Sequence, residues 1–227
     1  MKSKDGQKKC GLAMMKYEHI LSDVKQKAEY LIKLNPGPVS KIIENSISNM
    51  YSIPQYESTL VLIDHMKKNS NIIVLASWLS LMLLEMLSKT DKANNIILLD
   101  HDKSVISVGQ TISTMYKNMD IKYIRKNVVF DNTSEYLINR DVIVIPSINM
   151  LLPFDDLLPK VPKDTLVSIT GTSNMKMRYG NPIYNADDLK SQITYKELYF
   201  AKQYDTSWSI NNSDVFKFIT SVIVARI

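Results

Sequence analysis

Residues 71–102 constrain the fold more than any other part of this chain. The apolar run Asn71–Ser77 passes into an apolar helical pattern, and a second apolar run, after a polar break, ends at Asp100. Short apolar runs on either side of a helical pattern are typical of buried parallel strands. The segment therefore predicts a strand–helix–strand unit with a carboxylate at the end of its second strand.

The rest of the chain divides into a helical beginning and an alternating middle. Before residue 70 the apolar spacing is helical, and prolines separate three expected helices, at Leu12–Asn35, Pro38–Met50 and Pro54–Lys68. From there strands and helices alternate. We expect strands at Ile72–Ala76, Asn95–Asp100, Ile121–Arg125, Asp141–Pro146 and Thr165–Thr170, with helices at Trp78–Ser88, Lys103–Asn118, Thr133–Asn139 and Asn149–Leu158.

The end of the chain has a different pattern. Lys196–Tyr204 and Val215–Ala225 are extended, and only the polar loop Asp205–Asp214 separates them, so they should pair as an antiparallel hairpin. The sequence thus predicts an α/β fold: a doubly wound, mostly parallel seven-stranded sheet with a C-terminal antiparallel β-hairpin and an N-terminal helical extension. We expect the extension, residues 1–70, to cap a sheet domain formed by residues 71–227.

The composition of the chain indicates the cellular compartment in which the protein is found. Cys10 is the only cysteine, which excludes an intrachain disulfide and fits the reducing cytoplasm. No apolar run reaches the ~20 residues of a membrane-spanning helix. We therefore expect a soluble, cytoplasmic protein with no membrane partner.

The net charge of +5 is partly concentrated near the N-terminus, in Lys2, Lys4, Lys8 and Lys9. We expect this end to be a solvated, mobile tail, and contact with phosphates is the alternative. Arginine, which base readout and bidentate phosphate binding favour, occurs only four times. A small-molecule substrate is therefore expected ahead of a nucleic acid. The oligomeric state stays open, and a homodimer is one option.

The order of the expected elements resembles the class I S-adenosylmethionine-dependent methyltransferases. In that family a terminal hairpin inserts an antiparallel seventh strand beside the fifth, whereas a generic dinucleotide-binding domain would end in another strand–helix unit. The resemblance covers about residues 38–227 and includes Asp100. It implies a Rossmann-like methyltransferase-type domain at residues 71–227, a transferase activity and S-adenosylmethionine as the cofactor.

The glycine-rich first turn of that family falls at Ala76–Ser80, where this sequence has no glycine. Glycines in a dinucleotide-binding turn let the backbone approach a pyrophosphate, and Trp78 would block such an approach. S-adenosylmethionine has no phosphate, so a turn that binds it has less need of glycine. The resemblance implies that Ser77, Trp78 and Ser80 border the cofactor. The alternative is structural, with Ser77 as a helix N-cap and Trp78 packed inside.

Acidic and amide side chains follow the second and third expected strands. Asp100 follows Ser77 by about the 20 residues expected for an acid that binds a ribose, and its carboxylate can accept from both ribose hydroxyls. Its alternative is a solvated strand-end acid. Asp102 is either the ribose ligand or the cap of the next helix. In the resembling family the loop at Asp131 and Asn132 meets the adenine amino group, although both residue types are also common in turns and caps.

The fourth strand ends near the transferred methyl group in the resembling family, which makes Ser147 and Asn149 the candidate catalytic residues. The Asn/Asp-Pro-Pro-aromatic motif of amino-methylating members is absent. Ordinary loop residues are the alternative reading of both positions. His19, His65 and His101 fall on different expected elements without metal-ligand spacing, so we expect no metal.

Three functions are consistent with these residues. The first is an S-adenosylmethionine-binding, methyltransferase-like protein that acts on a small molecule or another acceptor. The second is a member of the same fold that has lost catalysis and serves as a binding or regulatory subunit, as the glycine-free turn suggests. The third is an aminopropyl or aminocarboxypropyl transferase that resembles nicotianamine synthase.

Overall fold

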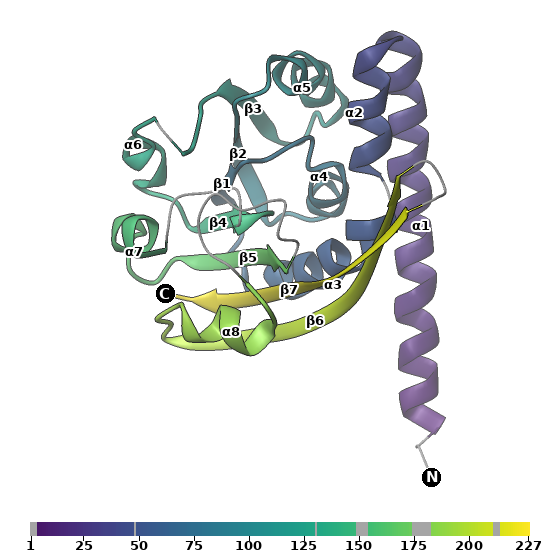
Figure 1. Ribbon diagram of the computed structural model, residues 1–227. Coiled ribbons are helices and arrows are strands. Elements are labelled where there is room, and N and C mark those ends of the chain that lie inside the picture. The colour runs from purple at the N-terminus through teal and green to yellow at the C-terminus, as the bar shows by residue number, and fades with distance from the viewer. Residues whose placement is uncertain (1–3, 48, 130, 149–153, 174–182, 211–213) are drawn as a thin grey trace.

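The computed structural model describes residues 4–47, 49–129, 131–148, 154–173, 183–210 and 214–227 (Figure 1). Three helices, α1 (Lys4–Leu34), α2 (Pro38–Ser46) and α3 (Asn49–His65), precede the first strand. The remaining elements are β1 (Ser70–Leu75), α4 (Leu81–Ser88), β2 (Ala93–Asp100), α5 (Lys103–Met115), β3 (Asp120–Arg125), α6 (Ser134–Leu137), β4 (Val142–Ile145), α7 (Phe154–Leu157), the 3₁₀ helix η2 (Leu158–Lys160), β5 (Leu166–Thr172), α8 (Ala186–Ser191), β6 (Glu197–Ile210) and β7 (Asp214–Arg226).

The seven strands form one sheet in the order β3-β2-β1-β4-β5-β7-β6. Strands β1 to β5 are parallel, and β7 is antiparallel to both β5 and β6. The predicted fold class, a mostly parallel seven-stranded sheet with a C-terminal antiparallel hairpin, is confirmed. The chain winds outward from β1 to β3 and then returns to place β4 on the other side of β1. Strands β1 and β4 therefore flank a topological switch point, where α/β sheets bind their ligands.

The central strands are covered on both faces, as their continuous apolar runs require. On one face, Ile72 and Val74 of β1 pack with side chains of α1 to α5, whereas Ile73 and Leu75 pack on the other face with side chains of α6, α7 and α8. All four residues are almost completely buried, and each such side chain contributes about 1.5–3 kcal/mol of hydrophobic stabilisation. Because β1 and its neighbours are packed on both faces, the ends of these strands are held in fixed positions.

The N-terminal helices differ in extent from the expected ones. Helix α1 begins at Lys4, so the expected mobile tail is helical from that residue onward. Helix α3 begins at Asn49, which places Pro54 inside it and not at its start. Pro54 is the sixth residue of α3, so its missing N–H leaves one intrahelical hydrogen bond unmade, and the helix continues through this position. Within the part of the chain that the structure describes, no helix is both long and apolar enough to cross a bilayer.

The C-terminal hairpin is longer than the sequence pattern predicted. The expected loop Asp205–Asp214 is strand as far as Ile210, with Thr206 opposite Phe218. The hydroxyls of Thr206 and Thr220 lie 2.9 Å apart in the buried part of the hairpin. Polar residues that pair across strands were thus mistaken for a loop. Helix α8 was not predicted, although the Asn185 side chain caps it by accepting from Asp188 N.

Candidate ligand site at the carboxyl edge of the sheet

Three chain segments leave the sheet side by side at the switch point. The turn Ala76–Ser80 follows β1, Asp100 ends β2, and Ser147 comes shortly after β4. Because β1 lies between β2 and β4, the turn lies between the other two segments. This arrangement brings together the sequence-predicted residues on which the cofactor prediction mainly depends.

The turn after β1 has a backbone shape that normally favours glycine. Ala76, Trp78 and Ser80 have φ angles of 51°, 48° and 49°, in the left-handed region. Each such L-residue costs about 1–2 kcal/mol, and strain of this kind persists only where the surroundings hold it. The prediction that a helix begins at Trp78 was wrong, because these alternating left-handed residues delay α4 until Leu81.

Tertiary hydrogen bonds hold this strained turn. The backbone N–H of Ser77 donates to Leu99 O at 2.9 Å, and that of Trp78 donates to Asp100 Oδ2 at 2.8 Å. The hydroxyl of Tyr123 donates to Leu79 O at 2.7 Å. Three consecutive residues of the turn are therefore anchored to β2 and β3, which explains how the left-handed residues are maintained without glycine.

The side chains of Ser77, Trp78 and Ser80 differ in their burial and hydrogen bonding. Ser77 is 1% exposed and its hydroxyl donates to Trp78 O at 3.0 Å, so the predicted N-cap role is wrong. Ser80 occupies the N-cap position of α4 but makes no capping bond, since its hydroxyl donates to Ser77 O. Trp78 is 38% exposed, which contradicts the alternative that it packs inside. Trp78 is thus the most exposed residue of the turn.

Asp100 is a buried carboxylate and not a solvated strand-end acid. It is 4% exposed. Its Oδ2 accepts from Trp78 N, and its Oδ1 accepts from Asp102 N at 3.0 Å. The exposed His101 ring lies 3.6 Å from the same Oδ1. Since a carboxylate has about four acceptor positions, the two backbone bonds leave capacity for a ligand hydroxyl on each oxygen.

Three of the remaining candidates act as local backbone acceptors. Asp102 caps α5, with Oδ1 accepting from Ser104 N at 2.7 Å. Asp131 accepts from Asn127 N at 2.8 Å, and Asn132 accepts from Ser134 N at 3.0 Å. Each of these side chains therefore has the structural use that the sequence left as its alternative. Asp131 and Asn132 are also exposed after β3, so a further contact with a ligand stays sterically open.

Comparison with known proteins gives a structural likeness only. No family model matches the chain, and no curated protein matches its sequence. Among solved structures, a candidate RNA methyltransferase from Pyrococcus horikoshii superposes with a TM-score of 0.53 at 11% identity, over 78% of this chain and 85% of that one. A candidate methyltransferase from Bacillus halodurans gives 0.51 at 9% identity, over 75% and 97%. This chain has the class I methyltransferase fold.

The two candidate catalytic residues lie after β4. Ser147 is partly buried beyond the end of β4, and Asn149 lies outside the described residues. Within the described ranges, no three His, Cys, Asp or Glu side chains come together as a metal site would require.

Sequence reasoning missed Tyr123, the residue of β3 that contacts the turn. Burial and, to a lesser extent, the nearby Asp100 carboxylate raise the pKa of Tyr123, so its hydroxyl keeps its proton and acts as a donor. No local signal could have found this contact, because tyrosine is ordinary in a strand and its partner Leu79 is distant in sequence.

Proposed function

We propose that this chain binds S-adenosylmethionine at the switch point of the sheet and transfers its methyl group to a small molecule or another acceptor. The observation that carries the proposal is the buried Asp100 carboxylate, which ends β2 beside the turn after β1. Two backbone N–H groups fix its orientation. A carboxylate held in this way has acceptor capacity left on both oxygens, and in this proposal two vicinal ribose hydroxyls donate to it.

The turn supports a cofactor without a pyrophosphate. Its backbone is left-handed at three positions without glycine, and its middle residue is an exposed tryptophan, Trp78, where the close approach of a diphosphate would need a small residue. In this proposal, the turn from Ser77 to Ser80 borders the methionyl and ribose parts. Asp102, Asp131 and Asn132 are the candidate contacts of the ribose and adenine.

The acceptor would bind toward β4, on the side of Ser147 and Asn149. Methyl transfer to a competent nucleophile depends mainly on proximity and alignment, so these residues need only orient the acceptor. The helices before residue 70 pack on the face of the sheet that α4 and α5 also cover.

Calorimetric titration with S-adenosylmethionine and S-adenosylhomocysteine tests the proposal. We expect saturable binding of both, and absence of heat at millimolar ligand would overturn it. Asp100→Ala should weaken binding by about 1–3 kcal/mol, because charge-assisted hydrogen bonds to the ribose are lost. Asp120→Ala is the matched control, since Asp120 is an exposed carboxylate at the opposite end of β3. Equal affinities of the two variants would exclude the ribose role of Asp100.

The second candidate function is that of a binding or regulatory subunit without catalysis. The strained, glycine-free turn with its exposed Trp78 favours it. To separate the two, S-adenosylhomocysteine formation is measured with small-molecule and RNA fractions of a cell extract as acceptors. Binding without turnover in every fraction supports the subunit, whereas turnover in one fraction supports the enzyme and identifies its acceptor class.

A further inference from the structure

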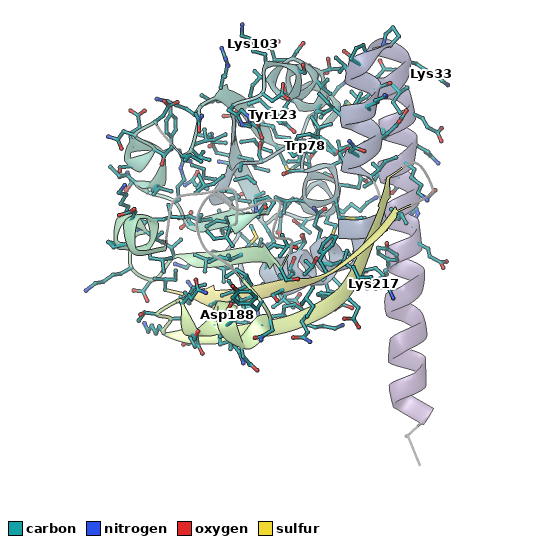
Figure 2. All side chains as sticks on the ribbon, in the orientation of Figure 1. Lys33, Trp78, Lys103, Tyr123, Asp188 and Lys217 are labelled. Carbon is teal, nitrogen blue, oxygen red and sulfur yellow. The ribbon has the colours of Figure 1, made fainter. Side chains whose placement is uncertain are left out.

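Tyr123 reaches the turn from two strands away. It lies on β3 and is paired in register with Leu98 of β2, while the turn follows β1. Its hydroxyl nevertheless donates to the carbonyl of Leu79 at 2.7 Å. Figure 2 labels Tyr123 and Trp78 on the same part of the molecule. The contact therefore ties the third strand to the first turn of the site.

Gly109 of α5 provides the space for the Tyr123 ring. A Cβ atom at position 109 would lie 2.3 Å from Tyr123 Cγ and 2.4 Å from Cδ1, far inside contact distance. Glycine inside a helix costs about 1 kcal/mol relative to alanine. The helix accepts this cost where the ring packs against its backbone, so the ring is confined between α5 and the sheet.

Tyr123 and Asp100 hold two consecutive residues of the turn. Asp100 accepts from the N–H of Trp78, and Tyr123 donates to the carbonyl of Leu79, which is completely buried. Trp78 and its neighbours at positions 76 and 80 are the left-handed residues. The two contacts thus act where the strain is located, one on each side of the peptide group that joins Trp78 to Leu79.

We propose that Tyr123 is a positioning residue of the ligand site. Through Leu79 it holds the glycine-free turn in its left-handed shape, and Gly109 makes room for it. A glycine-rich turn adopts this shape at no steric cost, whereas Ala76, Trp78 and Ser80 must be held in it. The effect of Tyr123 on cofactor affinity rests on the proposed function, but its effect on the shape of the turn does not.

Tyr123→Phe tests the proposal because it keeps the ring and removes only the hydroxyl. Its matched control is Tyr204→Phe, which removes a hydroxyl bonded to Glu57 at 2.6 Å in the hairpin. Both variants are made in a Trp208→Phe background, so that Trp78 is the only tryptophan. We expect Tyr123→Phe to shift Trp78 emission and to weaken S-adenosylmethionine binding roughly threefold to tenfold, the effect of one hydrogen bond. The control should change neither.

A rescue separates positioning from general destabilisation. Adding Ala76→Gly to Tyr123→Phe should restore part of the affinity and of the Trp78 emission, because glycine takes a positive φ without strain. Wild-type emission and affinity in Tyr123→Phe would overturn the proposal, as would an equal change in Tyr204→Phe or absence of rescue. If the unmutated site binds no S-adenosylmethionine, the proposed function fails, and the emission measurement still decides the role of Tyr123.

Discussion

Lys27 Nζ lies 2.7 Å from Oε2 of Glu85, so an ion pair joins α1 to α4. Glu85 is only 3% exposed in its side chain, and it also accepts from the Tyr116 hydroxyl at 3.2 Å and pairs with Lys89 at 3.2 Å. Helix α4 directly follows the strained turn Ala76–Ser80. The N-terminal helix is thus tied electrostatically to the helix that supports the candidate site.

Glu85→Gln should lower the free energy of unfolding by about 2 kcal/mol. The amide cannot neutralise Lys27 and Lys89, and breaking a buried ion pair by changing one partner is destabilising. The partly exposed lysines can turn to solvent, which keeps the loss below that of a fully buried pair. Urea unfolding measures the effect, with the exposed Glu29→Gln on α1 as control. A change no larger than that of the control would contradict this role of Glu85.

The stability of the α1–α4 contact should fall in acid. The hydrogen bond from Lys89 to Asp23, 2.8 Å long, lowers the pKa of Asp23 in the folded chain. A lowered pKa means that the unfolded chain takes up the proton first as pH falls. This contribution is therefore complete above the unfolded pKa of about 3.9 and is lost as pH falls through the lowered folded pKa.

The pH dependence can be assigned with Asp23→Asn, which should flatten the acid limb of a plot of unfolding free energy against pH. Asp205→Asn, at an exposed position of β6, is the control and should leave the curve unchanged. Identical curves for wild type and Asp23→Asn would show that this pair does not contribute.

Gly109→Ala should destabilise the fold although alanine is the better helix former. The added methyl group would overlap the Tyr123 ring, and overpacking of this kind typically costs about 1–3 kcal/mol. With the ring removed by Tyr123→Ala, the same substitution should become stabilising by up to about 1 kcal/mol, the helix propensity difference. A double-mutant cycle of unfolding free energies measures this change of sign. Additive effects would mean that the two residues do not compete for space.

Ala76→Gly should stabilise the fold by about 0.5–1 kcal/mol. It relieves a left-handed alanine at φ 51°, and the gain of about 1–2 kcal/mol is partly offset by the higher chain entropy of glycine. Ala201→Gly, on the exposed edge strand β6, should instead be destabilising. Thermal unfolding of the two variants provides the comparison, and a loss of stability in Ala76→Gly would show that the turn is not strained at this residue.

The sheet could be predicted well because its strands carry their own signal. Ile72 to Leu75 are buried on both faces, so an unbroken apolar run marked β1 without reference to its neighbours. Boundaries were less predictable where a residue's conformation depends on distant groups. Helix α4 starts at Leu81, three residues later than expected, after a turn in which Trp78 N–H donates to Asp100 and Leu79 O accepts from Tyr123.

The order of the strands, most of the helices, the hairpin and the place of Asp100 at the end of β2 could be predicted from the sequence, because periodicity and strand-end position are local properties. The burial of Asp100 with two backbone donors, and the exposure of Trp78, result from the folded arrangement of the chain. The support of the turn by Tyr123 and Gly109 was likewise invisible in the sequence. These contacts join residues far apart in the chain, and only packing of the sheet against α5 brings them within reach.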